Sequence, residues 1–190
     1  MLQRSQRHYS EDDYFAVEAS SGIKHEFYRG EIFAMAGASL AHNHISANIL
    51  SVLRSAVRSH GCSAFGSDLR VKTPDGLFTY PDVMVVCGTI ALTADRPDTI
   101  TNPAVIVEVL SDATREYDQG EKFALYQAIP SLQEYLLIEQ AHIHTTHWQR
   151  QPTGEWTAQT YTTLDAVVSF RTPGVVLPLR AIYAEVFASS

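Results

Sequence analysis

The spacing of apolar positions along the chain predicts helices that alternate with strands. Apolar residues recur at helical spacing over 42–60 and 112–128, and Ser10, followed by three acids, is typical of the start of an earlier helix. Nearly continuous aliphatic runs over 104–110 and 134–139 are typical of strands buried on both faces of a sheet. Further strand-like segments lie at 24–28, 31–36, 62–67, 69–73 and 80–87, and antiparallel strands are expected around 142–148, 156–161 and 166–170.

The order of these elements predicts the α/β class. We expect a mixed sheet core in the order helix, three strands, helix, strand, preceded by an N-terminal helix and a hairpin that turns at Arg29-Gly30. An antiparallel meander follows the core at the C-terminal end. Because no repeat, low-complexity tract or linker interrupts the pattern, we expect residues 1–190 to form a single domain.

Composition narrows the functions that this fold can carry. The chain has 190 residues and is 45% hydrophobic, too apolar for a disordered chain, and its formal net charge of −7 excludes a wholly basic nucleic-acid clamp. The net charge does not exclude a local basic groove, for which the candidate residues are Arg54, Arg58, Arg70 and Arg115. Since the apolar runs are strand-sized and the polar start lacks a signal-peptide core, we expect no membrane association and a cytoplasmic location.

The chain has two cysteines, Cys62 and Cys87, 25 positions apart. No CxxC motif or Cys/His ligand spacing accompanies them, which argues against a zinc site and against a disulfide scaffold. We therefore expect both to be reduced, buried thiols.

Glu108 is the strongest chemical anomaly in the sequence, because it lies inside a run of aliphatic residues. A buried carboxylate costs several kcal/mol unless it is paired, protonated or bound to a cation. Asp82 lies at the start of the neighbouring strand, so the two acids are expected to converge at one edge of the sheet. With a main-chain carbonyl such as that of Val109 they form an oxygen-rich site suited to Mg²⁺ or Mn²⁺.

Hydrolysis at such a site also needs a cationic group, and Lys122 is the candidate. Asp118, Lys122 and Tyr126 follow at steps of four, so they share one face of the helix after Glu108. The alternative is that Asp118 and Lys122 form an ordinary exposed pair, a common feature of solvated helices.

The order Pro81-Asp82, then Glu108-Val109-Leu110, then Lys122 resembles the PD-(D/E)XK nuclease superfamily, with one departure. Leu110 stands where the superfamily has its lysine, which can move to the neighbouring helix. Nearly the whole chain is similar to a large bacterial family of restriction-endonuclease-like proteins, and the matching segments are 25–31, 39–45, 67–71, 80–83, 107–111 and 134–135, with Thr114, Asp118, Lys122 and Tyr126.

This resemblance implies a restriction-endonuclease-like core and a catalytic site. Asp82 and Glu108 are the implied metal ligands and Lys122 the displaced lysine, while Glu26 and His42 match further family positions at the rim of the same cleft. The implied activity is Mg²⁺- or Mn²⁺-dependent hydrolysis of DNA that leaves a 5′-phosphate, with no organic cofactor. A homodimer would fit the cutting of two strands.

Less specific interpretations of these residues stay open at this stage. Glu26 is equally explained as an exposed hairpin acid, and His42 as a histidine near a helix start. His142 and His144 alternate on one strand and could bind a metal, although solvent-facing histidines are commoner there. The whole protein could instead be an inactive nuclease fold that binds DNA or protein, or a structural domain in which Glu108 is neutral or salt-bridged.

Overall fold

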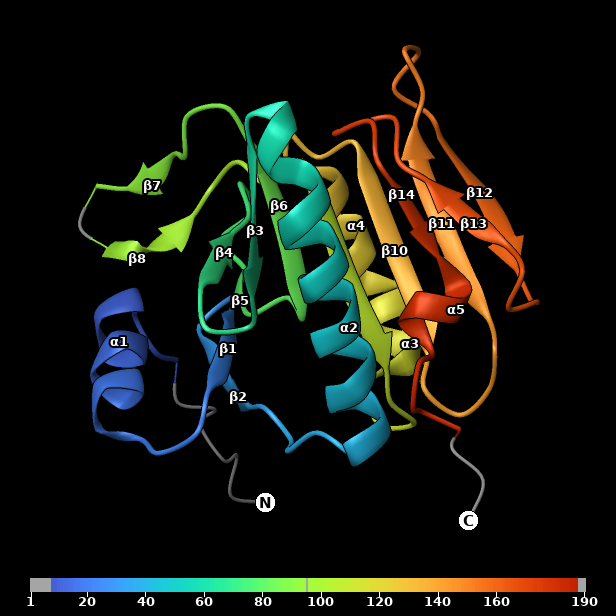
Figure 1. Ribbon diagram of the computed structural model, residues 1–190. Coiled ribbons are helices and arrows are strands. Elements are labelled where there is room, and N and C mark those ends of the chain that lie inside the picture. The colour runs from blue at the N-terminus through green and yellow to red at the C-terminus, as the bar shows by residue number, and fades with distance from the viewer. Residues whose placement is uncertain (1–7, 95, 188–190) are drawn as a thin grey trace.

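The computed structural model describes residues 8–94 and 96–187, whose strands form two six-stranded sheets and one small hairpin sheet (Figure 1). The first sheet has the order β2-β1-β5-β4-β8-β7 and consists of β1 (His25–Tyr28), β2 (Glu31–Ala34), β4 (Arg70–Lys72), β5 (Phe78–Thr79), β7 (Leu92–Thr93) and β8 (Arg96–Ile100). The second has the order β12-β11-β10-β9-β6-β3 and consists of β3 (Cys62–Gly66), β6 (Val83–Cys87), β9 (Val105–Leu110), β10 (Glu134–Glu139), β11 (Thr145–Arg150) and β12 (Trp156–Tyr161).

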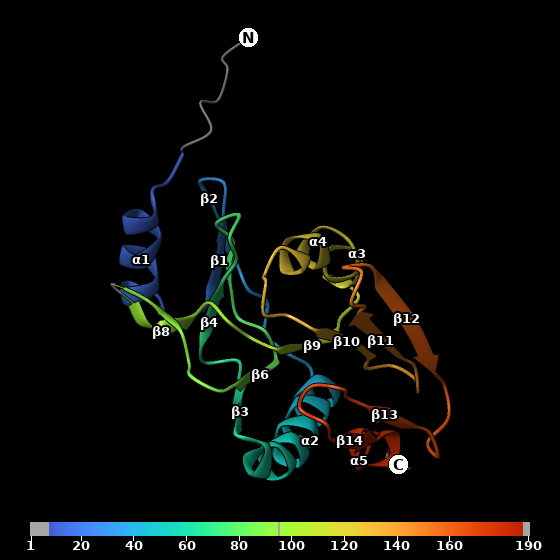
Figure 2. The ribbon, with the colours of Figure 1, turned by 90° about the horizontal axis from the view of Figure 1, so that it is seen from above.

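The helices and the small sheet pack around the second large sheet and beside the first. The helices are α1 (Glu11–Ser20), α2 (Leu40–Val57, followed by the 3₁₀ turn Arg58–His60), α3 (Arg115–Gln119), α4 (Glu121–Gln127) and α5 (Leu179–Ile182), and β13 (Val167–Ser169) pairs with β14 (Val176–Pro178). Figure 2 shows α2 and the β13–β14 hairpin on one face of the second sheet, and α3 and α4 on the other. None of the helices in residues 8–94 and 96–187 is long and apolar enough to cross a membrane.

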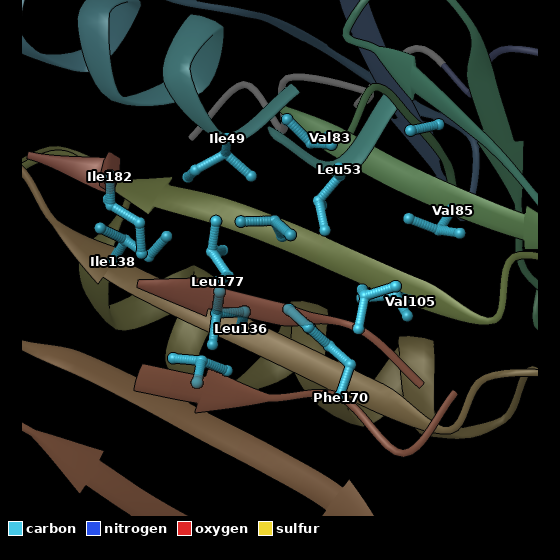
Figure 3. Close-up of a cluster of buried hydrophobic side chains, with 14 of the residues drawn as sticks. Ile49, Leu53, Val83, Val85, Val105, Leu136, Ile138, Phe170, Leu177 and Ile182 are labelled. Atoms are coloured by element: carbon cyan, nitrogen blue, oxygen red, sulfur yellow. The ribbon is translucent and has the colours of Figure 1, made fainter. Parts of the chain in front are cut away.

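Both faces of β9 are buried, which explains its aliphatic sequence. Val105, Val107 and Val109 pack towards α2 and the β13–β14 hairpin, in the cluster of buried side chains that Figure 3 shows. The alternate residues Ile106 and Leu110 pack with α4 on the opposite face. Because successive strand residues point to opposite faces, Glu108 lies on the α4 side.

Local sequence features agree with the elements that they predict. Ser10 caps α1, with its hydroxyl accepting a hydrogen bond from the main chain of Asp13. Arg29 and Gly30 both have positive φ, 47° and 81°, as a two-residue hairpin turn requires. Gly61 ends the segment after α2 in the left-handed conformation.

Several segments differ from the sequence prediction, which also lacks β7, β8, β14 and α5. The predicted strand over 80–87 is shorter in the structure, since β6 begins at Val83, and residues 80–82 link it to β5, which ends at Thr79 in the first sheet. Pro81 lies in the crossing and has no N–H to donate to a sheet. The predicted helix over 112–128 is interrupted at Gly120 between α3 and α4, and the segment over 166–170 pairs with β14 rather than with the meander.

The expectation of two reduced thiols was wrong, because Cys62 and Cys87 form a disulfide. The two residues face each other directly in the antiparallel register of β3 and β6, with their Cα atoms 4.0 Å apart. Spacing along the sequence carried no information about this register.

Arg70 also differs from its expected place in a basic groove, because it is buried in the first sheet. It pairs with Glu18 at 3.5 Å and with Asp98, and it donates a hydrogen bond to the hydroxyl of Tyr80 at 3.1 Å. It is 5% exposed and its guanidinium is occupied by these partners, so it does not contribute to an exposed basic groove. Its role here is to neutralise acids from α1 and β8.

We expect Arg70→Met to lower the free energy of unfolding by about 3 to 5 kcal/mol, because removal of one partner leaves buried acid without compensation. Urea denaturation measures this change. The matched control is Arg180→Met, which removes an exposed pair with Asp165 and should cost less than about 1 kcal/mol. An equal loss of unfolding free energy in Arg70→Met and Arg180→Met would contradict a buried structural role for Arg70.

Candidate active site

The junction between the two large sheets brings Asp82 and Glu108 together. Strands β6 and β9 are antiparallel, with Val83 opposite Val107, so Asp82 lies level with the last residues of β9. The main-chain N–H of Asp82 donates to Oε2 of Glu108 at 3.4 Å. In return, the Asp82 carboxylate accepts a 2.7 Å hydrogen bond from the main-chain N–H of Val109.

The main chain of Val109 faces the same place as these two carboxylates. A strand residue directs its N–H and its C=O towards the same neighbouring strand. Because the N–H of Val109 reaches Asp82, its carbonyl lies on the Asp82 side of β9 as well. Two carboxylates and one carbonyl therefore converge at this end of the sheet.

His42 approaches this group from the first turn of α2. Ser39 caps that helix by accepting a hydrogen bond from the main-chain N–H of His42, and Nε2 of the imidazole lies 3.2 Å from Oδ2 of Asp82. Burial alone would lower the pKa of His42, but the hydrogen bond and charge of Asp82, with a hydrogen bond to the main chain of Val109, raise it. The interpretation of His42 as merely a helix-start histidine is therefore incomplete.

Glu108 is compensated by a lysine and a tyrosine. Its side chain is 4% exposed, and Oε1 lies 2.9 Å from Nζ of Lys122 and accepts a 2.8 Å hydrogen bond from the hydroxyl of Tyr126. Burial raises the pKa of Glu108 to about 8, with the charges of Asp118 and Asp82 acting in the same direction and Lys122 opposing them. Glu108 and Lys122 therefore form a salt bridge, as expected if the protein were a purely structural domain.

Lys122 lies at the centre of the acid cluster. Besides Glu108, Nζ lies 3.1 Å from Glu26 and 3.4 Å from Asp118. Burial on its own lowers the pKa of Lys122, but Glu108 and the other acids hold it well above its usual range. Both Lys122 and Asp118 are 4% exposed, so the alternative of an ordinary surface pair was wrong.

Glu26 brings the first sheet into the same cluster. It lies on β1, is 9% exposed, and accepts a hydrogen bond from the hydroxyl of Thr79 on β5 in addition to its contact with Lys122. The alternative of an exposed hairpin acid was therefore wrong. Elements from both sheets, α2, α3 and α4 all contribute to one site.

Thr79, Tyr117 and Tyr135 were not among the predicted site residues, although Tyr135 lies in a segment that matched the family. Thr79 reaches Glu26, and Tyr117 also hydrogen-bonds to Glu26, with burial as the main cause of its raised pKa. Tyr135 donates to the main-chain carbonyl of Asp118 at 3.0 Å, which fixes the end of α3. Residue spacing does not show these contacts, because they join different sheets and helices.

The site carries more negative than positive charge. Glu26, Asp82, Glu108 and Asp118 face one lysine and His42, so a divalent cation fits the electrostatics of the donor set. The described residues contain no group of three or more His, Cys, Asp or Glu side chains arranged to hold a metal ion. Two carboxylates and one carbonyl instead match Mg²⁺, which usually keeps several water ligands.

The expectation that His142 and His144 lie on one strand was wrong, because β11 begins at Thr145 and both residues precede it. The rings of His142 and His144 contact each other with centroids 5.8 Å apart, whereas His147 is buried against Glu134. Trp148 and Trp156 pack on Phe123, as core residues do.

Comparison with known proteins places this architecture in a family. A family model named Uma2 and described as "Putative restriction endonuclease" matches residues 11–180. The chain belongs to the Uma2 family. Two proteins from Synechocystis sp., described as the uncharacterized proteins sll1609 and slr1290, are similar to this chain. The protein sll1609 is 36% identical over 145 residues, which cover 76% of this chain and 82% of sll1609. The protein slr1290 is 32% identical over 177 residues, which cover 92% of this chain and 90% of slr1290.

A solved structure shows the same fold as this Uma2 protein. A crystal structure described as a putative nuclease belonging to DUF820, from Anabaena variabilis, matches with a TM-score of 0.71 and 18% identity, covering 87% of this chain and 93% of that one. The predicted mixed α/β, restriction-endonuclease-like architecture is thereby confirmed.

The metal-free Uma2 protein should lose stability as pH rises from about 5 to about 8. The pKa values of Glu108, Asp118 and His42 are all raised in the folded protein. Such groups contribute stability that is complete below their unfolded pKa values and is lost as pH rises through the folded ones. Urea denaturation in EDTA at several pH values between about 5 and about 8 tests this prediction, because the denaturation midpoint should fall as pH rises.

Glu108→Gln removes one of these titrations and should flatten the pH dependence. Glu155→Gln, at an exposed acid of the loop before β12, is the matched control and should keep the wild-type slope. A slope in Glu108→Gln as steep as that of the wild type would show that another group causes it.

Proposed function

We propose that this Uma2 protein is a divalent-metal-dependent DNA endonuclease that hydrolyses phosphodiester bonds. The observation that carries the proposal is the convergence of Asp82, Glu108 and the main chain of Val109 beside the buried amine of Lys122. Two acids and a carbonyl can hold a hard divalent cation, and a lysine can stabilise negative charge that develops on a phosphate.

Each residue of the site has a distinct role in this proposal. Asp82, Glu108 and the Val109 carbonyl would hold the Mg²⁺ or Mn²⁺ ion. When bound, the ion supplies Lewis-acid polarisation of the scissile phosphate and activation of the attacking water. Lys122, held protonated by its acid neighbours, offsets negative charge that develops on the phosphate and orients the water.

The position of Lys122 supports its role as the displaced lysine. Residues two apart on a strand share a face, so a lysine at position 110 would lie on the same side of β9 as Glu108. Leu110 instead packs there in the core, while Lys122 reaches Glu108 from α4 on that same side. The Lys122 amine therefore lies on the same face of β9 as a lysine at position 110 would, although it is carried by α4.

The remaining polar residues position these groups. His42 holds the Asp82 carboxylate, and Tyr126 fixes one oxygen of Glu108. Glu26 and Asp118 hold Lys122 from two further directions. Glu26 and His42 were predicted as site residues, and we propose that they position Lys122 and Asp82 respectively.

Nicking of supercoiled plasmid DNA in Mg²⁺ or Mn²⁺ tests the proposal. We expect Asp82→Asn, Glu108→Gln and Lys122→Met each to lower the rate by about 10²-fold or more, since each removes charge stabilisation of the transition state. Asp165→Asn, at an exposed acid far from these residues in the sequence, is the control and should cut at the wild-type rate. Thermal melts of each variant show that the protein is folded.

An inactive nuclease fold that binds DNA or protein is the second candidate, and the existing salt bridge between Glu108 and Lys122 favours it. Calorimetry with Mg²⁺ or Mn²⁺ distinguishes the two. Binding of the ion without cleavage by the wild type would support the inactive module, and cleavage lost in the three variants would support the enzyme.

We also propose that the protein forms a homodimer, which would allow it to cut both DNA strands. Analytical ultracentrifugation measures the mass of the assembly directly.

A further inference from the structure

The exposed face of α2 carries a second set of polar side chains beyond the candidate active site. Ser51, Arg54, Ser55 and Arg58 follow at helical spacing and line a hollow of about 320 Å³. A larger hollow of about 450 Å³ lies on the other side of the same two arginines, between α2 and β3. Both hollows are open at the surface of a protein whose net charge is −7.

Arg54 and Arg58 differ from every other lysine and arginine in residues 8–94 and 96–187. Each of the others has an ion pair, a hydrogen bond or a ring contact, among them Lys24 with Asp68 and Arg180 with Asp165. Arg54 and Arg58 are exposed and lack any such partner within the described chain. Like charges four residues apart on a helix repel each other, so their spacing does not serve helix stability.

We infer that the surface formed by Ser51, Arg54, Ser55 and Arg58 binds the phosphate backbone of a nucleic acid strand. Arginine guanidinium groups and serine hydroxyls are common ligands of backbone phosphates and carry no sequence information. This inference rests on the proposed function, because it assigns a path for the substrate that the candidate active site would cut.

The geometry leads from this surface to the candidate active site. Arg54 comes 12 residues after His42 on the same helix, so the two are about 18 Å apart along its axis, and Arg58 is about 24 Å away. At 3.4 Å per nucleotide, these distances correspond to about five to seven base steps.

The larger hollow continues along β3 in the same direction. It extends from Cys62 to Gly66, and Gly66 pairs with Val83, the residue after Asp82. The one acid on its lining, Asp68, is paired with Lys24 at 2.7 Å. A strand held at the arginines could therefore run towards Asp82 without facing an unpaired acid on the hollow.

Fluorescence anisotropy with labelled duplexes in EDTA tests the surface without cleavage. We expect the double variant Arg54→Gln/Arg58→Gln to weaken binding of a duplex of about 24 base pairs by about 10-fold or more. The slope of log affinity against log salt should fall by about 2, because each lost phosphate contact removes about one unit.

Two controls separate backbone binding from a change in net charge. Arg171→Gln/Arg180→Gln makes the same change in charge on exposed arginines near the C-terminal end, and it should keep wild-type affinity. Arg54→Lys/Arg58→Lys keeps the charge and should keep most of the salt dependence. Equal weakening by both glutamine double variants would overturn the assignment, as would unchanged binding in Arg54→Gln/Arg58→Gln.

The same measurements distinguish failure of this inference from failure of the proposed function. Plasmid cleavage that depends on Asp82, together with unchanged duplex binding in Arg54→Gln/Arg58→Gln, would overturn the inference and leave the nuclease assignment in place. Absence of cleavage by the wild type, together with arginine-dependent duplex binding, would overturn the nuclease assignment and support the binding surface. A wild type that binds no duplex overturns the inference directly.

Discussion

The contacts of the buried Lys122 amine are the interaction on which the site depends. One amine lies within 3.4 Å of carboxylates from β1, β9 and α3, so it joins the two large sheets and the helical layer at a single point. In a medium of low polarity such a group is stable only when its partners are held in place. The fold around it accordingly supplies hydrogen bonds from Tyr126, Thr79 and Tyr135 to the acids or to their main chain.

The crossing at Pro81 explains how a site of this kind arises between two sheets. Strand β5 belongs to the sheet that carries Glu26, and β6 belongs to the sheet that carries Glu108. The short segment between them therefore places Asp82 at the boundary, half-way between the two sheets in the chain. There its carboxylate lies 3.2 Å from the imidazole of His42 on α2.

Sequence alone predicted the elements whose signals are local. The aliphatic run of β9, the glycine turn at Gly30 and the conflict between Glu108 and its neighbours are all visible within a few residues. What it could not predict depends on contacts between distant segments. The disulfide between Cys62 and Cys87 follows from strand register, and the burial of Glu26 follows from packing against α4, neither of which residue spacing encodes.

The distribution of charge connects the candidate active site with the surface on α2. Once ionised, the four acids outnumber one lysine and one histidine, and they repel a phosphate at the point where the proposed chemistry needs it. A bound cation reverses that repulsion over a short distance, but it does not attract a long polyanion to a protein with net charge −7, because salt screens charges more than about 10 Å apart. Attraction must then come from exposed positive groups outside the acid cluster. Arg54 lies on α2, the helix that carries His42, and Arg58 lies in the 3₁₀ turn that follows it, so both are placed to provide that attraction.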